Sequence, residues 1–153
     1  MRIVTYNVNG IKARLPRLLE YLEEQQPEVV CLQELKAQDD NFPEAEIARA
    51  GYGALWHGQK SWNGVAVLAR GEQPVERLRG LPGDATDEQA RYLETEIGGL
   101  IVASLYLPNG NPVPGPKFDY KLAWMARFAE HARGLLKEER PVVLAGDYNV
   151  IPN

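Results

Sequence analysis

The sequence predicts an α/β protein with a mixed sheet and flanking helices. Two observations support this prediction. A strand, an amphipathic helix and a second strand follow one another at each end of the chain, and hairpin signals lie between these two units. Strands joined by a helix pair in parallel by default, whereas hairpin strands pair antiparallel. The sheet should therefore contain both kinds of neighbour.

The first strand–helix–strand unit opens the chain. Residues 2–10 contain β-branched residues and end at a glycine, which favours a strand followed by a turn. Leucines at helical spacing predict a helix over residues 15–26, with Pro16 in its first turn and Pro27 after its end. Residues 28–34 contain a continuous apolar run, which is typical of a strand that is buried on both faces.

The sequence pattern in the middle of the chain predicts a short helix and two hairpins. The helix stops before a glycine, and glycines also lie at the turns of both hairpins. In chain order, we expect a helix over residues 43–50, an extended piece over 52–56, and strands over 65–69, 91–97 and 100–107.

The second strand–helix–strand unit ends the chain. The loop over residues 108–116 contains four prolines, so it cannot be regular. Apolar residues at helical spacing then predict a long amphipathic helix from Phe118 to Leu135. The apolar run 142–145 predicts a last buried strand, which breaks abruptly into polar residues.

Length and composition favour a single globular domain over residues 1–153. The chain is 44% hydrophobic and 25% charged, and no apolar run approaches the length of a membrane span. The net charge of −4 argues against indiscriminate binding of nucleic acid, although a local basic cluster could still bind it. The chain contains a single cysteine, Cys31, which cannot form an internal disulfide, and a predicted strand begins near Met1 where a signal peptide would lie. We therefore expect the protein to be in the reducing cytoplasm.

Polar side chains mark the ends of four predicted strands. They are Asn7, Glu34, Tyr106 and Asp147, with Asn149 two residues further on. Ligand-binding groups in α/β sheets gather at the carboxyl ends of parallel strands. If these strands lie side by side and run the same way, the polar side chains meet in one oxygen-rich site. Continued alternation along the last strand would turn Asp147 and Asn149 to the same side.

An oxygen-rich site favours Mg²⁺ or Mn²⁺ over zinc. Mg²⁺ usually takes one or two protein carboxylates and completes its octahedron with water and substrate phosphate. Glu34 is the best single candidate ligand, whereas the two histidines, His57 and His131, are far apart in the sequence. Hydrolysis of a phosphoester requires that the charge on the non-bridging and leaving oxygens is neutralised and that a water molecule lies in line with the bond that breaks. A metal, a carboxylate, an amide and a phenol can divide these tasks.

Five segments that contain these residues resemble, in the same order, motifs of the exodeoxyribonuclease III family. They are TYNVNGI at residues 5–11, CLQELK at 31–36, WNGVA at 62–66, LYLPNG at 105–110 and GDYN at 146–149. The resemblance implies a fold like one half of a four-layered α/β sandwich. It also implies Mg²⁺-dependent cleavage of double-stranded DNA beside abasic sites, with trimming of 3′ ends.

The same resemblance implies roles for individual residues. Glu34 would hold the metal, helped by Asn7. Tyr106 would act near the scissile phosphate. Asp147 would orient or activate water or assist the leaving oxygen, and Asn149 would hold the phosphate or the water. Further substrate-binding residues would be Asn9, Lys36, Asn109 and Arg91. Of these, Arg91 would contact the DNA backbone.

The resemblance runs along the whole chain but covers only about the first half of the family's usual length. The family's second acidic strand end and its closing Ser-Asp-His motif have no counterpart here, so we expect the chain to be inactive alone. We also expect its sheet to expose an apolar face, which a missing C-terminal half or a second copy would cover.

Two other functions stay open at this point. A related metal phosphoesterase that acts on RNA or a small phosphate ester would use the same machinery. A non-catalytic DNA-binding or interaction module would bind DNA in a salt-sensitive way without needing Glu34.

Several other residues have a structural interpretation. We expect Cys31 to be a small buried hydrophobe, His131 a solvated helix residue and Asn63-Gly64 only a hairpin turn. Tryptophans could stack on bases but more often belong to the core, and the chain contains three, Trp56, Trp62 and Trp124.

Overall fold

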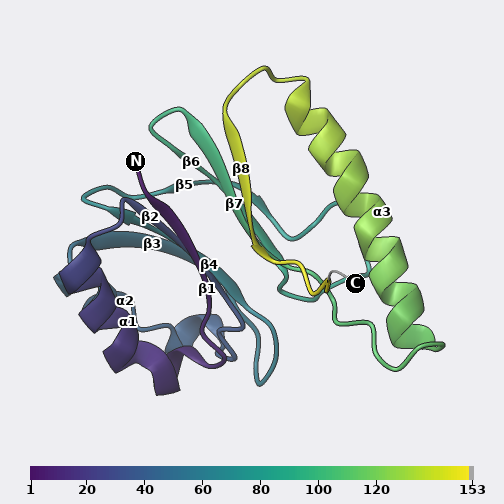
Figure 1. Ribbon diagram of the computed structural model, residues 1–153, viewed down its shortest axis with the longest axis horizontal. Helices are drawn as coiled ribbons and strands as arrows, with labels where there is room; N and C mark the ends of the chain where they lie inside the picture. The colour runs from purple at the N-terminus through teal and green to yellow at the C-terminus, as the bar shows by residue number, and fades with distance from the viewer. Residues whose placement is uncertain (152–153) are drawn as a thin grey trace.

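The computed structural model describes residues 1–151 and arranges them in four layers (Figure 1). Two four-stranded sheets pack face to face, and helices cover the outer face of each sheet. Three clusters of buried apolar residues lie between successive layers. All four layers are thus present within this chain.

The first sheet contains the opening strand–helix–strand unit and one hairpin. Its segments are β1 (Ile3–Asn7), α1 (Ile11–Gln25), β2 (Val29–Gln33), a 3₁₀ turn (Asp39–Asn41), α2 (Glu44–Arg49), β3 (Tyr52–His57) and β4 (Val65–Arg70). The strands lie in the order β1-β2-β4-β3, with β1 parallel to β2 and the other neighbours antiparallel. Leu18 and Leu22 of α1 and Ile47 of α2 pack on the outer face of this sheet.

The second sheet contains the closing unit and another hairpin. Its segments are β5 (Val75–Arg79), β6 (Tyr92–Ile97), β7 (Leu100–Tyr106), α3 (Pro116–Leu136) and β8 (Val142–Asp147). The strands lie in the order β5-β6-β7-β8, and only β7 and β8 pair in parallel. Trp124 and Phe128 of α3 pack against Tyr92 and Leu105 on the outer face of this sheet.

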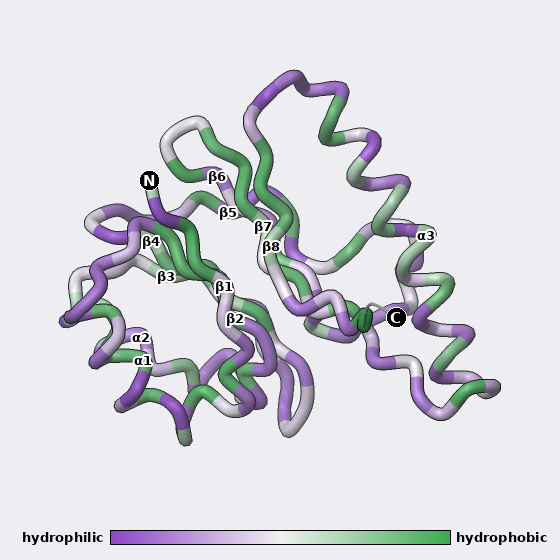
Figure 2. Tube along the Cα trace, in the orientation of Figure 1, coloured by the Kyte–Doolittle hydropathy of each residue, from purple (hydrophilic) through white to green (hydrophobic). Residues whose placement is uncertain are grey.

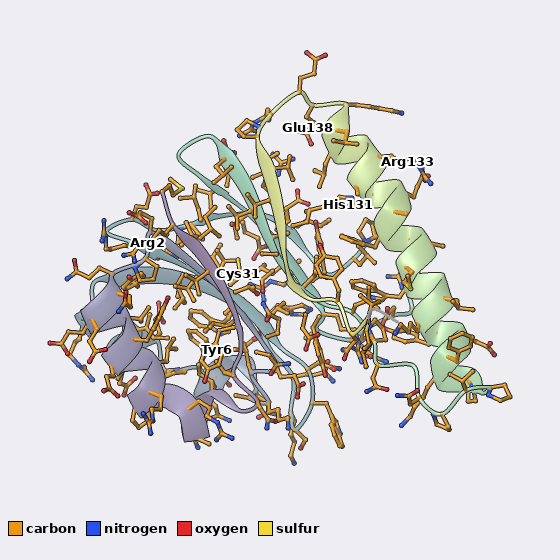
Figure 3. The ribbon with its side chains drawn as sticks, in the orientation of Figure 1. Arg2, Tyr6, Cys31, His131, Arg133 and Glu138 are labelled. Carbon is orange, nitrogen blue, oxygen red and sulfur yellow. The ribbon has the colours of Figure 1, made fainter. Side chains whose placement is uncertain are left out.

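Apolar side chains from both sheets fill the space between them. Cys31 and Val67 of the first sheet belong to the same buried cluster as Leu93 and Val102 of the second. Figure 2 shows the facing strands of both sheets as mainly hydrophobic. Cys31 lies in this layer (Figure 3), where burial raises the pKa of its thiol to about 12. The prediction that Cys31 is a small buried hydrophobe is confirmed.

The predicted α/β class and the mixed pairing are confirmed, but the strands divide between two sheets instead of forming one. β4 and β6 do not pair through their backbones, because the two sheets pack against each other through side chains. β5 was not predicted. Its sequence, VERLR, contains only two apolar residues, and the register shift between Glu76 and Leu78 breaks the alternation that would mark a strand.

The first helix also differs from its prediction. α1 begins at Ile11, directly after Gly10, whose φ of 98° turns the chain out of β1. The Ile11 N–H donates to the carbonyl of Leu35 at 2.9 Å, which ties the helix start to the segment after β2. Pro16 therefore lies inside the helix and not in its first turn.

The expectation of an exposed apolar sheet face is wrong for residues 1–151. The inner face of each sheet is covered by the other sheet, and the outer faces carry helices. What stays open is an edge of each sheet. β1 and β8 are outermost strands that lie near one another, and every residue of β8 is only half-buried.

None of the helices within residues 1–151 combines the length and the apolar character that crossing a membrane requires.

A buried carboxylate anchors α3 to the second sheet. Glu94 is only 2% exposed and accepts hydrogen bonds from the Tyr92 hydroxyl at 2.6 Å and from Arg77 Nε at 2.8 Å. His131 Nε2 lies 2.7 Å from the same carboxylate. Burial disfavours the charge of Glu94, but its hydrogen-bond partners outweigh burial and lower its pKa. His131 is therefore a half-buried anchor (Figure 3) and not the solvated residue that we predicted.

Candidate active site

The ends of four strands meet at one rim of the two sheets. β1 runs parallel to β2 in the first sheet, and β7 runs parallel to β8 in the second. Face-to-face packing brings β1 near β8 and β2 near β7. Asn7, Tyr106 and Asp147 are the last residues of their strands, and Glu34 directly follows β2. The strand ends therefore bring these side chains together from both sheets.

Hydrogen bonds join the four side chains into one cluster. Asn7 Nδ2 donates to Glu34 Oε1 and to Asp147 Oδ2, each at 2.9 Å. The Tyr106 hydroxyl donates to Glu34 Oε1 at 2.7 Å. Because a carboxamide nitrogen carries two hydrogens, Asn7 can bridge both acids at once. The predicted convergence is present, although it spans two sheets where the sequence predicted one.

Two turns hold the backbone of Glu34 in place. Glu34 and Lys36 have φ values of 53° and 52°, in a region that costs a residue other than glycine about 1–3 kcal/mol. The Gly10 N–H donates to the Glu34 carbonyl at 2.8 Å, and the Lys36 N–H donates to the Asn63 carbonyl at 2.9 Å. Asn63-Gly64 is therefore more than the simple hairpin turn that we predicted, because it supports the segment that carries Glu34.

The surroundings of Glu34 keep it ionised. Burial disfavours its charge, but hydrogen bonds from Asn7 and Tyr106 and the nearby charge of Lys36 together lower its pKa. Lys36 Nζ lies 3.6 Å from Glu34 Oε2, on the oxygen that neither Asn7 nor Tyr106 contacts. The Glu34 side chain is 21% exposed, so the acid remains open to solvent.

Tyr106 is held as a hydrogen-bond donor. Burial and the hydrogen bond to Glu34 raise the pKa of its hydroxyl to about 12, so the hydroxyl stays protonated at neutral pH. The Arg91 guanidinium lies 5.0 Å from the centre of the Tyr106 ring, and its Nη1 donates to the Tyr106 carbonyl at 3.1 Å. Arg91 thus lies beside the site and packs on a residue of the cluster, and its contact to DNA stays a prediction.

Asp147 and Asn149 share a cavity, but not for the reason that we predicted. β8 ends at Asp147, and Asn149 has a φ of 47°, so the alternation of an extended strand is lost. Asp147 Oδ1 instead accepts the Asn149 N–H at 3.0 Å, which closes a tight turn. Asn149 Nδ2 donates to the Leu107 carbonyl at 2.6 Å. Both residues line a cavity of about 550 Å³ together with Asn7.

The predicted substrate-binding residues surround this cluster at different distances. Lys36 Nζ donates to Asn9 Oδ1 at 2.5 Å, so these two residues contact each other beside Glu34. Asn109 is exposed, and it lines both the cavity that contains Asp147 and a neighbouring cavity beside Tyr106. The structure thus places all nine predicted residues around one rim.

The donor set fits a hard divalent cation. Within residues 1–151, no group of three or more His, Cys, Asp or Glu side chains could hold a metal ion. Mg²⁺ needs only one or two carboxylates, and Glu34 Oε2 already faces the positive charge of Lys36. The Asn7 oxygen accepts the Asn9 N–H at 3.0 Å, so its amide nitrogen faces Glu34. A metal-binding role for Asn7 stays a prediction.

Sequence reasoning missed one residue that supports the site. Lys121 of α3 donates from Nζ to the carbonyl of Asn149 at 2.8 Å and to that of Asn109 at 3.3 Å. It ties the two loops that carry these asparagines to the helix. A lysine on an amphipathic helix normally lies in solvent, so the sequence pattern contained no signal for this contact.

A small residue before Asp147 is a requirement of the site. A Cβ atom on Gly146 would lie 2.0 Å from the Leu105 carbonyl oxygen, which is part of the neighbouring strand. We expect Gly146→Ala to displace the end of β8 and lower the free energy of unfolding by about 1–3 kcal/mol, measured by urea denaturation.

A glycine in open space provides the control for this substitution. A Cβ atom on Gly134 in α3 would have no neighbouring atom within 4 Å, so Gly134→Ala should leave stability unchanged or raise it by about 0.5–1 kcal/mol. Equal stability of Gly146→Ala and the unchanged chain would contradict the role assigned to Gly146.

Comparison with known proteins identifies the same architecture. Residues 4–153 match the model of the Endonuclease/Exonuclease/phosphatase family. Exodeoxyribonuclease III of Haemophilus influenzae is 36% identical over 158 aligned positions, which cover 100% of this chain and 59% of the relative. The chain therefore spans little more than half the length of this relative.

Solved structures agree closely with the fold. The 3′-5′ exonuclease NExo of Neisseria meningitidis superimposes with a TM-score of 0.95 at 37% identity, covering 99% of this chain and 59% of that protein. An AP endonuclease of Archaeoglobus fulgidus superimposes with a TM-score of 0.93 at 35% identity, covering 100% of this chain and 59% of that protein. With its strand-end cluster shared between two sheets, this chain belongs to the Endonuclease/Exonuclease/phosphatase family.

Proposed function

We propose that this chain forms the N-terminal part of a DNA repair nuclease of the exodeoxyribonuclease III type, which hydrolyses phosphodiesters at abasic sites and 3′ ends with Mg²⁺. The observation that carries the proposal is the cluster in which Asn7 joins Glu34 to Asp147 and Tyr106 donates to Glu34. The names of the relatives, an exodeoxyribonuclease, a 3′-5′ exonuclease and an AP endonuclease, support DNA as the substrate.

The residues of the cluster divide the work of hydrolysis. Glu34 would hold Mg²⁺, or Mn²⁺ in its place, and the bound ion would supply positive charge against the oxygens of the phosphate. Tyr106, protonated at neutral pH, would donate a hydrogen bond near the scissile phosphate. Asp147 is oriented by Asn7 and by the Asn149 N–H, so it would place or activate the attacking water or assist the leaving oxygen.

The amide of Asn149 would hold the phosphate or the water. One hydrogen of its nitrogen is used by the Leu107 carbonyl, and an amide nitrogen carries a second hydrogen that could meet the substrate. Asn9, Lys36, Asn109 and Arg91 surround the cluster, and we propose that they contact double-stranded DNA. Lys36 would be released from Glu34 when a cation takes its place.

The chain spans 59% of its relatives, so we propose that a C-terminal part completes the activity. That part would extend the two sheets beyond β1 and β8, whose outer edges have no neighbouring strand within residues 1–151. A second copy of the chain is the alternative partner for the same edges.

A chimaera tests the proposed function. Residues 1–151 would replace the matching segment of the Neisseria meningitidis 3′-5′ exonuclease, whose fold agrees with a TM-score of 0.95. We expect the chimaera to digest a 3′ end in Mg²⁺, and we expect Asp147→Asn within it to lower kcat by about 100-fold or more, because a group that acts in the transition state is lost.

A residue outside the site provides the control for the chimaera. Glu72→Asn changes an exposed acid and should leave the rate unchanged. A folded chimaera that binds DNA but digests no 3′ end would refute the proposed function and favour a non-catalytic binding module. Preference for an RNA or a small phosphate ester in competition assays would favour a related phosphoesterase.

A further inference from the structure

A second cavity lies beside Tyr106, and the chemistry proposed above leaves most of it unused. Its volume is about 770 Å³, which is within the range of about 300–1,000 Å³ that is usual for small-molecule sites. Its walls come from the loop before β4, the segment that enters β6 and the proline-rich loop that leads into α3. The cavity adjoins the catalytic cluster through Tyr106, which lines it.

The wall of this cavity combines positive charge with aromatic rings. Arg91 and Lys117 supply the charge, and Trp62, Tyr106 and Tyr120 supply the rings. Among its lining residues within 1–151, none is a carboxylate, although the protein as a whole has a net charge of −4. Cations that neutralise phosphate and rings that stack on bases are the two features by which proteins bind single-stranded nucleic acid.

Trp62 differs from the other two tryptophans. It is 68% exposed, whereas Trp124 is 1% exposed and packs from α3 into the core against the second sheet. Trp56 is partly buried and stacks on Phe42 with ring centres 4.3 Å apart. The prediction of core tryptophans therefore holds for Trp124 and Trp56. The Trp62 ring is free to meet a ligand.

The loop that presents Trp62 is held in one conformation. Asn63, only 8% exposed, donates from Nδ2 to Gln59 Oε1 at 3.1 Å, and the same oxygen accepts the Ala90 N–H at 2.7 Å. The Gly64 N–H donates to the Ala90 carbonyl at 2.8 Å. Binding at Trp62 therefore costs little ordering of the loop.

Arg91 is also fixed in place. Its Nε donates to Gln89 Oε1 at 2.7 Å, and its guanidinium lies near the rings of Tyr106 and Tyr120. A fixed guanidinium between aromatic rings places positive charge on the cavity wall at a defined position. Lys117 is exposed at the start of α3 and adds a second, mobile charge.

We propose that this cavity binds an unstacked nucleotide next to the scissile phosphate, with its base on Trp62 and its phosphate held by Arg91 and Lys117. The proposal rests on the proposed function and deepens it, because it names a frayed end of double-stranded DNA as the form of the substrate that uses this cavity. A base that stays stacked in a blunt duplex cannot offer its face to Trp62.

Isothermal titration of the 153-residue chain with a 5′-phosphorylated thymidine dinucleotide, in EDTA, tests this proposal. We expect Trp62→Ala to weaken binding on the order of 10-fold or more, and Trp62→Phe to keep most of the affinity because it keeps a ring. Lys117→Met should weaken binding and reduce its dependence on salt. Tyr21→Ala removes an exposed aromatic residue of α1 and is the matched control, with no expected change.

Three results would overturn the nucleotide site. They are equal affinity for Trp62→Ala, equal affinity for a blunt duplex, and full competition by inorganic phosphate alone. A test that omits metal keeps this proposal separate from the proposed function, since Glu34→Gln should still bind the dinucleotide. An inactive chimaera would refute the nuclease, and Trp62-independent binding with an active chimaera would refute only the nucleotide site.

Discussion

Glu34→Gln should weaken the binding of Mn²⁺ to this chain by on the order of 100-fold or more. Substitution of residues that merely support a metal ligand costs about 10- to 100-fold in affinity, so loss of the ligand itself should cost at least as much. Glutamine keeps the size of the side chain and can still accept hydrogen bonds from Asn7 and Tyr106, which should preserve the fold. Isothermal titration with Mn²⁺ measures the effect.

A control must distinguish the loss of a negative charge from the loss of a metal ligand. Glu72→Gln removes the same charge from an exposed position and should leave Mn²⁺ affinity within about twofold, since exposed charges are screened by salt. The pH dependence provides a further check. The pKa of Glu34 is lowered from its ordinary value of 4.5, so the carboxylate stays ionised at pH 4.5 and above. Mn²⁺ binding should therefore persist at neutral pH and fall only when the pH drops below 4.5. Unchanged affinity in Glu34→Gln would remove Glu34 from the metal site.

The 153-residue chain alone should show no turnover on a duplex that contains an abasic site. Catalytic groups that act together lose most of their rate when some of them are removed, and this chain spans 59% of its relative. On a duplex with a 3′ end, we expect the isolated chain to digest that end at least about 1,000-fold more slowly than the chimaera in Mg²⁺. A gel assay of duplex cleavage over several hours compares the two.

The opposite outcome of this assay has a clear meaning. Cleavage by the isolated chain that disappears in Glu34→Ala would show that residues 1–153 hold a complete active site. Cleavage that persists in Glu34→Ala would indicate a contaminating nuclease, and the preparation would then be repeated with an inactive host strain. Analytical ultracentrifugation of the same sample tells whether two copies of the chain associate.

The site was predictable from sequence because its signal is local. Each strand end joins an apolar run to a polar side chain, as Val29 to Leu32 do before Glu34. A buried strand and the polar residue after it are both visible in a few neighbouring positions. The residue types then suggested the chemistry that we propose, and the strand ends brought these residues together.

The division into two sheets was not predictable in the same way. Which strands pair is decided by contacts between distant residues, such as those between Cys31 and the second sheet, and periodicity contains no information about them. β5 was missed because it is a short edge strand with exposed charges. The prediction that side chains keep alternating from Asp147 to Asn149 was wrong, because the Asn149 N–H donates to Asp147 and closes a tight turn there.

Interactions of long polar side chains were also missed. His131 and Lys121 both lie on α3, and the sequence assigns such residues to solvent. Each one instead contacts a group that is more than 25 positions away, Glu94 for His131 and Asn149 for Lys121. The predicted cytoplasmic location stays a prediction.

Paramagnetic broadening by Mn²⁺ in the NMR spectrum of the chain tests the central claim most directly, because it reports where the ion lies among the residues of both sheets. We expect trace Mn²⁺ to broaden the signals of Asn7, Glu34, Tyr106 and Asp147 together, and to spare those of Tyr21 and Val75. Broadening around other acids, such as Asp39 and Asp40, with sharp signals from Glu34 and Asp147, would contradict a shared metal and phosphate site at this rim.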